Sequence, residues 1–179
     1  MTSSKDTELD LAVAQAESAR AGEVLNGPHQ GQGLRIAFAC GKFNGGITTR
    51  LLKAALDALE EAGVAKADIS IAWAPGAFEL PLLAKAYATA SRPYDAVITL
   101  GAVIRGDTGH YDVVAGECAR GVQDVQLATG VPVIFGVLTT DTIEQALVRS
   151  LPDETNKARE SAHTALEMAN VLRSGSLGA

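Results

Sequence analysis

Aromatic side chains are scarce in this chain of 179 residues: they make up 4% of it, whereas apolar residues as a class make up 47%. A core must therefore be built from Ala, Val, Leu and Ile, which suit close packing of helices on a sheet. A basic excess is also missing, because 15 Lys and Arg stand against 21 Asp and Glu. The net charge of −6 argues against a basic nucleic-acid-binding surface, so we expect no nucleic-acid partner.

Cysteines and long apolar runs are equally sparse. The two cysteines, Cys40 and Cys118, lie far apart and lack the spacing of a metal site, so we interpret them as small buried apolar residues. The polar, acidic start of the sequence does not resemble a signal peptide, and no apolar run reaches the length of a membrane span. We therefore expect a cytoplasmic protein with no metal ion and no membrane contact.

The first 33 residues differ in composition from the others. They hold five acidic residues against two basic ones, and so carry half of the net charge. Residues 9–24 are rich in Ala and Glu and favour a helix. Residues 26–33, with their Gly and Pro, are typical of a flexible segment that interrupts regular secondary structure. We predict a flexible acidic extension over 1–33 and a single domain over 34–179.

From residue 34 onward, strand-like and helix-like patterns alternate. Apolar runs with β-branched residues predict strands over 34–40, 69–74, 96–104 and 131–138. Apolar residues at helical spacing predict helices over 45–61, 78–90, 111–128, 142–150 and 156–173. This alternation predicts an α/β fold: a three-layer sandwich with a central four-stranded parallel sheet flanked by helices.

The most informative segment is residues 99–112, TLGAVIRGDTGHYD, which joins a buried strand to the start of a helix. Ligands of parallel sheets bind outside the carboxyl ends of the strands, and a helix N-terminus there suits a phosphate. Thr108 adds a hydroxyl and His110 adds an imidazole, a good acid or base near neutral pH. The segment predicts anion binding beside a proton-transfer group. Arg105 is either a ligand group or the partner of a nearby carboxylate.

Two other loops follow strands and are expected at the same edge. Phe43 lies among small residues, and it either stacks on a planar ligand or caps the core. The glycines of its loop do not fit the dinucleotide-binding motif. Pro75 and Gly76 predict a sharp turn whose backbone groups can contact the edge of a heterocycle. Glu79 alternatively stabilises the start of the next helix through the helix dipole.

The last such loop follows the fourth expected strand. Residues 139–142 supply threonines suited to the N-cap of a helix, and this capping role explains them fully. Phe135, within the strand, is of a kind that more often belongs to a core than to a ligand site. The residue pattern alone does not assign a role to Arg149 or Lys157.

Together these segments resemble the lumazine synthase family over roughly residues 34–173. The matching motifs are Phe43-Asn44, PGAFELP at 75–81, GAVIRGDT at 101–108 with His110, FGVLTT at 135–140, EQA at 144–146 with Arg149, and Asn156-Lys157. The resemblance implies a flavodoxin-like fold for the domain over 34–179. It also implies condensation of 5-amino-6-(D-ribitylamino)uracil with 3,4-dihydroxy-2-butanone 4-phosphate to 6,7-dimethyl-8-ribityllumazine, the penultimate step of riboflavin biosynthesis, with release of phosphate and water and no cofactor.

The resemblance further assigns roles to single residues. His110 matches the proton-transfer histidine, and Asp107 and Thr108, with Arg149, hold the phosphate. Phe43 stacks on the pyrimidine ring. The substrate-binding set as a whole is Phe43, Asn44, Ala77, Phe78, Glu79, Ala102, Val103, Ile104, Asp107, Thr108, Phe135, Arg149 and Lys157. An Asp at 107 suits backbone rather than side-chain contact with a phosphate.

The resemblance also implies a homo-oligomer, either a pentamer or a cage of sixty subunits made from twelve pentamers. In that arrangement the residues matching Phe135, Arg149 and Lys157 come from the neighbouring subunit. Three alternatives stay open: an archaeal-type riboflavin synthase of the same fold, a shell-forming structural relative, and a carrier that binds lumazine or flavin. Retention of Phe43, His110 and Arg149 argues against a purely structural role.

Overall fold

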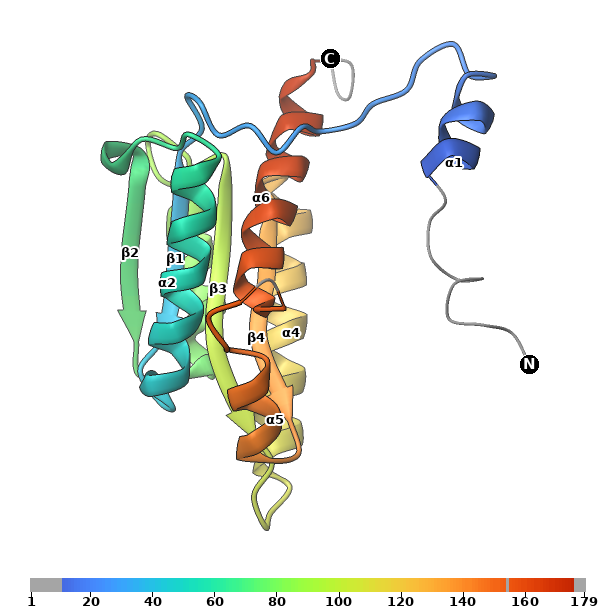
Figure 1. Cartoon of the computed structure of the whole chain (residues 1–179). Helices are drawn as coiled ribbons and strands as arrows, with labels where there is room; N and C mark the ends of the chain where they lie inside the picture. Colours follow the sequence, from blue (N-terminus) through green and yellow to red (C-terminus); the bar gives the residue numbers. More distant parts are fainter. Residues whose placement is uncertain (1–10, 154, 176–179) are drawn as a thin grey trace, which may run out of the picture.

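A computed structural model describes residues 11–153 and 155–175 of the chain (Figure 1). Four parallel strands form one sheet in the order β2-β1-β3-β4. The strands are β1 (Ile36–Gly41), β2 (Ile69–Ala74), β3 (Ala96–Ile104) and β4 (Val133–Thr140). The predicted three-layer α/β sandwich with a central four-stranded parallel sheet is confirmed.

Helices cover both faces of this sheet. On one face α2 (Gly45–Glu61) packs beside α6 (Lys157–Arg173), and the short α5 (Ile143–Val148) lies next to β4. On the other face lie α3 (Leu80–Ala88) and α4 (His110–Thr129). Each βα unit crosses over to a parallel neighbour, which requires helices on the faces of the sheet.

The core consists of two apolar layers, one on each face of the sheet. As the composition predicts, Ala, Val, Leu and Ile dominate both, and Phe38 is the one aromatic residue among the buried core residues of the described chain. Small side chains let α6 approach the sheet closely. A Cβ on Gly136 of β4 would lie 2.8 Å from the Thr99 carbonyl oxygen and 3.0 Å from the Ser161 hydroxyl, and because the backbone oxygen cannot move aside, glycine is required there.

The expected limits of β1, β4, α3, α4, α5 and α6 differ from the structure by one or two residues, and three of these differences have a clear local reason. β1 starts at Ile36 because the Arg35 N–H donates to the Asp95 carboxylate (2.7 Å) instead of to a strand. β4 runs to Thr140 and starts only after Pro132, which has no N–H for the ladder. The helix expected over 78–90 begins as a 3-10 helix, Ala77–Glu79, and becomes α-helical at Leu80.

The N-terminal part of the chain contacts the fold at residues 27–33. On α6, the Asn170 side-chain amide donates to the carbonyls of Pro28 and Gln30 (both 2.8 Å), and the His29 ring stacks on His163 with 4.8 Å between centroids. Gly27 lies so close to the Glu167 backbone that a Cβ would overlap it. The sequence did not predict these contacts, and the division at residue 33 stays a prediction.

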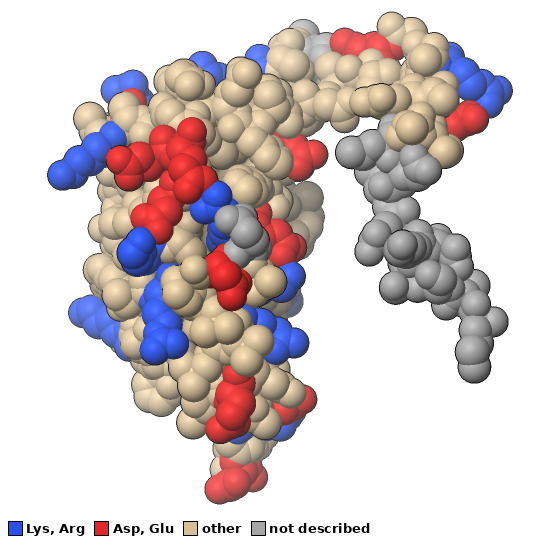
Figure 2. All heavy atoms as spheres, in the orientation of Figure 1, with Lys and Arg blue, Asp and Glu red and all other residues tan. Residues whose placement is uncertain are grey.

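Before this segment, α1 covers Leu11–Ser18 and stands apart from the sheet in Figure 1. It is shorter than the helix favoured over 9–24, of which residues 9 and 10 lie outside the described residues. Basic and acidic side chains are mixed over the face of the molecule shown in Figure 2. No helix in the described ranges is long and apolar enough to cross a membrane.

Both cysteine side chains are buried, as predicted, Cys40 in β1 and Cys118 in α4. Burial disfavours the thiolate and raises the pKa of Cys40 to about 12 and that of Cys118 to about 11. The thiolate is the reactive form of cysteine. We therefore expect the two thiols of the folded protein to react with a disulfide reagent at pH 8 at a rate at least ~100-fold lower than the thiols of the protein unfolded in guanidinium. Absorbance of the released thiolate measures both rates, and equal rates would contradict this burial.

Candidate functional site

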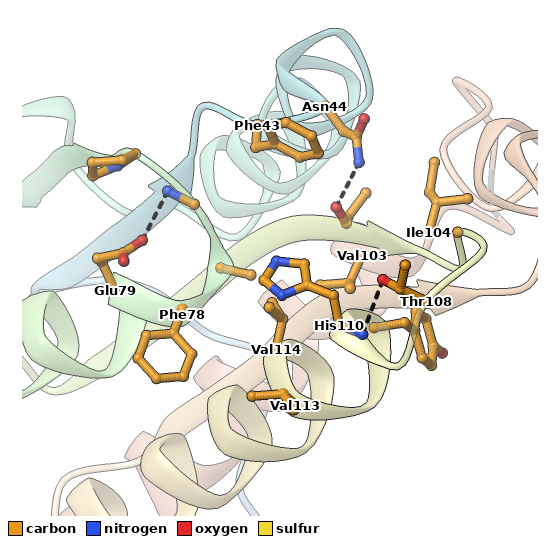
Figure 3. Close-up of a pocket in the computed structure, with 16 residues that line it drawn as sticks. Phe43, Asn44, Phe78, Glu79, Val103, Ile104, Thr108, His110, Val113 and Val114 are labelled. Atoms are coloured by element: carbon orange, nitrogen blue, oxygen red, sulfur yellow. Dashed lines mark hydrogen bonds between the residues drawn. The ribbon is translucent and has the colours of Figure 1, made fainter.

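A cavity of about 680 Å³ opens at the carboxyl ends of β1, β2 and β3 (Figure 3). From β1 the chain moves to β2 on one side and then to β3 on the other, so the topological switch point lies between β1 and β3. Ligands of open parallel sheets bind at such a point. The predicted gathering of polar loops at this edge is therefore present for the loops after β1, β2 and β3.

Phe43 presents its ring to this cavity from the loop after β1. Its side chain is 73% exposed, so the alternative role as a cap on the core is wrong. The backbone beneath the ring is fixed, because the Lys42 N–H donates to the Ala74 carbonyl (2.9 Å) and the Phe43 N–H donates to the Pro75 carbonyl (3.1 Å). An exposed aromatic face on a fixed backbone suits stacking on a planar ligand.

Asn44 connects this loop to β3. It has a left-handed backbone with φ of 57°, the one positive φ among the described non-glycine residues, and its side-chain amide donates to the Ala102 carbonyl (2.9 Å). Asn tolerates this conformation better than most residues. The hydrogen bond sets the separation of the loop after β1 from the end of β3, and hence the width of the cavity between Phe43 and Val103.

Two substitutions separate the backbone role of Asn44 from its hydrogen bond. We expect Asn44→Gly, which accepts the left-handed conformation, to lose only the hydrogen bond, about 1 kcal/mol of unfolding free energy. Asn44→Ala adds the strain of a side chain at positive φ, for a total of about 2–3 kcal/mol. Denaturant unfolding measures both variants. Equal losses would mean that the left-handed conformation costs nothing here.

The turn after β2 forms the opposite wall. The Glu79 carboxylate accepts a hydrogen bond from the Gly76 N–H (3.1 Å), which holds the turn closed in front of the short Ala77–Glu79 helix. Glu79 thus binds the helix start, the alternative that the sequence offered, and it also lines the cavity. Phe78 beside it is 53% exposed, so a second aromatic ring borders the space.

The end of β3 and the start of α4 complete the cavity. Ala102, Val103 and Ile104 line its floor, and the His110 ring projects into it from the first turn of α4, as Figure 3 shows. The backbone N–H of His110 donates a hydrogen bond to the Thr108 hydroxyl (3.4 Å). Because α4 has 20 residues, the positive end of its dipole lies at this edge beside an imidazole and favours an anion there.

Several lining residues were missed by the sequence analysis. Val113 and Val114 follow His110 by three and four positions, and therefore share its face of α4. That spacing was available in the sequence as a signal. The cavity is also lined by Pro75, Gly76 and Tyr111. The sequence analysis had interpreted the first two only as a turn and Tyr111 only as the beginning of a helix.

Four of the predicted site residues are not among the described residues that line this cavity: Asp107, Phe135, Arg149 and Lys157. Phe135 is 37% exposed on the edge strand β4, and not core as its position in a strand had suggested. Arg149 is the C-cap residue of α5. Its backbone carbonyl accepts a hydrogen bond from the Lys157 backbone N–H (3.1 Å), so these two residues are neighbours. Within one subunit, the structure does not bring them to His110.

In the described ranges, no group of three His, Cys, Asp or Glu side chains is arranged to hold a metal ion. The cavity therefore offers stacking surfaces, backbone groups, a helix N-terminus and one imidazole. A protein-family model described as 6,7-dimethyl-8-ribityllumazine synthase matches residues 33–173 and so covers all of these elements. The chain belongs to the 6,7-dimethyl-8-ribityllumazine synthase family.

Proposed function

We propose that this protein condenses 5-amino-6-(D-ribitylamino)uracil with 3,4-dihydroxy-2-butanone 4-phosphate to give 6,7-dimethyl-8-ribityllumazine, phosphate and water. The observation that carries the proposal is the cavity itself, in which an exposed Phe43 ring and the His110 imidazole at the N-terminus of α4 meet. These are a stacking surface, a proton carrier and an anion site, the three features that this reaction needs. Membership of the family supports this choice of substrates.

The pyrimidine substrate fits the side of the cavity that Phe43 borders. Its ring stacks on Phe43, and the backbone groups of the Ala77–Glu79 helix contact its edge. The ribityl chain lies along the end of β3, where Ala102, Val103 and Ile104 offer backbone groups. Asn44 contributes by holding the Phe43 loop to Ala102.

The phosphate of the second substrate lies at the start of α4. Thr108 and the first N–H groups of the helix bind it, and Asp107 takes part through its backbone rather than its carboxylate. Arg149 adds a guanidinium, which binds phosphate through two parallel hydrogen bonds. Positive charge around the phosphate also favours its departure.

The chemistry follows from this placement. The 5-amino group of the pyrimidine attacks the ketone and gives an imine with loss of one water. Elimination of phosphate and tautomerisation then leave a second carbonyl on the four-carbon unit. The ribitylamino nitrogen attacks this carbonyl, and the ring closes with loss of a second water. Protons move at each step, and His110 carries them between the reacting atoms. Holding two substrates together in one cavity supplies much of the acceleration. The reaction uses no metal and no organic cofactor.

A complete site requires a neighbouring subunit. Phe135, Arg149 and Lys157 come from that neighbour in the proposed homopentamer or in a sixty-subunit cage of twelve pentamers. The absence of these three residues from the described cavity lining supports this assembly, as does the exposure of apolar Ile143 and Val148 on α5 beside Arg149. Mass photometry measures the assembly, and a stable monomer would contradict it. The cytoplasmic location stays a prediction.

The decisive experiment mixes both substrates with the protein and follows lumazine fluorescence and free phosphate together. We expect both signals to rise at equal molar rates. Product without phosphate from lumazine alone would identify a riboflavin synthase instead. Ligand binding without turnover would identify a carrier, and neither binding nor turnover would leave a shell-forming role.

A further inference from the structure

Arg105 is the first residue after β3 and begins the loop that carries Gly106, Thr108 and His110 into the cavity. Its guanidinium makes two ion pairs: Nε donates to the Asp141 carboxylate (2.9 Å) and Nη1 donates to the Asp112 carboxylate (3.1 Å). The guanidinium carbon also lies 4.0 Å from the centre of the Tyr111 ring, in a cation–π contact.

These partners belong to different elements. Asp112 lies in the first turn of α4, and Asp141 directly follows β4. In addition, the backbone N–H of Arg105 donates to the Thr140 carbonyl at the end of β4 (2.9 Å). One side chain therefore joins the ends of β3 and β4 to the start of α4. Because two carboxylates already hold it, the guanidinium is the partner of nearby acids and not the phosphate ligand, the two roles that the sequence left open.

The contribution of these ion pairs to folding is small. The side chains of Arg105, Asp112 and Asp141 are 43%, 65% and 68% exposed, and exposed ion pairs add little stability. Their charges matter more for a ligand. Asp107, Asp112 and Asp141 put three carboxylates near the start of α4, where an anionic substrate has to bind, and Arg105 stands among them. The two acids raise the pKa of Arg105, Asp141 most, so its charge is constant near neutral pH.

We propose that Arg105 is a positioning residue for the phosphorylated substrate, an inference that rests on the proposed function. It fixes the 106–109 loop and the Tyr111 ring at the mouth of the cavity. It also offsets the charges of Asp112 and Asp141, so that the N-terminus of α4 attracts a phosphate rather than repelling it. Its contribution is specific to the anionic substrate, because the ribitylaminouracil carries no phosphate.

The test compares Arg105→Gln with the double variant Arg105→Gln/Asp141→Asn. We expect Arg105→Gln to raise the KM for dihydroxybutanone phosphate about tenfold and to weaken the binding of inorganic phosphate by the same factor. An effect of this size is expected when one nearby carboxylate loses the positive charge that compensates it. The KM for the pyrimidine should change less than about twofold. The double variant should recover about threefold, because it removes the carboxylate that Arg105 no longer neutralises.

Arg120→Gln is the matched control. Arg120 also makes two ion pairs on α4, with Glu117 and Asp124, but it lies ten residues beyond His110, about 15 Å along the helix, where salt screens its charge. Both KM values should stay within about twofold of wild type. Phosphate binding measured by calorimetry needs no turnover. A wild type that binds phosphate but forms no lumazine would therefore refute the proposed function, while the variants still decide the role of Arg105.

Equal increases in both KM values for Arg105→Gln, or unchanged phosphate binding, would overturn the proposal. So would a double variant no better than Arg105→Gln alone. If Arg105→Gln does not fold, Asp141→Asn alone decides the matter. It removes one carboxylate near the start of α4 and leaves Arg105 in place, so it should bind inorganic phosphate about threefold more tightly than wild type. Unchanged or weaker binding would refute the charge argument.

Discussion

Replacement of His110 by alanine is expected to lower kcat by about ten- to a thousandfold, the range in which a positioned acid or base contributes to proton transfer. The imidazole projects into the cavity from the first turn of α4, and His110 is an exposed residue, so the fold should persist. The KM values for both substrates should change less than about threefold. Steady-state rates of lumazine fluorescence measure these constants.

Some activity should remain in His110→Ala, because the cavity still holds the two substrates together. His163→Ala is the control, since His163 lies on α6, stacks on His29 and is remote from the cavity lining. It should turn over at the wild-type rate. A His110→Ala protein with full kcat would remove the imidazole from the proposed mechanism.

The second large effect is expected at Arg149. Arg149 is the C-cap residue of α5, and its Nη1 donates to the Gln145 carbonyl (3.1 Å), which leaves most of its donors for the phosphate that we propose it binds across the subunit interface. Arg149→Lys keeps the charge but loses the planar fork, so the KM for dihydroxybutanone phosphate should rise about tenfold. The KM for the pyrimidine should change little. Arg20→Lys, on the N-terminal segment, is the control with no expected effect.

Subunit mixing tests whether Arg149 and His110 act across an interface. Neither His110→Ala nor Arg149→Ala should form a complete site alone. In mixed rings with equal amounts of each, about a quarter of the interfaces pair an intact His110 with an intact Arg149. Activity should then rise well above the mean of the two variants. If it stayed at that mean after proven exchange of subunits, the shared-site proposal would be refuted.

Much of the fold was predictable because local patterns and global architecture agree. The limits of β2, β3 and α2 were predicted without error, since the apolar runs and the helical spacing end there close to Gly, Pro or polar residues. β4 was misplaced because Thr139 and Thr140 were read as cap residues, whereas Thr142 alone caps α5, with its hydroxyl accepting from the Gln145 N–H.

The site was predictable to the extent that it lies on strand ends. Phe43 and His110 follow directly from the rule that ligands bind beyond the carboxyl ends of parallel strands. The side-chain tie from Asn44 to Ala102 and the two ion pairs of Arg105 join residues far apart in the sequence, and no periodicity encodes them. The residues that we propose to act from another subunit, such as Arg149, cannot be placed by an argument about one chain.

The place of α6 has a consequence for synthesis on the ribosome. This helix is the last element within the described residues, and its Ala162, Ala165 and Leu166 belong to the core layer that α6 shares with α2 on one face of the sheet. A nascent chain that ends before residue 157 exposes this apolar face of β3 and β4 to water. Stable tertiary structure therefore has to await the emergence of α6 (Lys157–Arg173) from the ribosome, and chaperones that bind apolar segments have their best target in that interval.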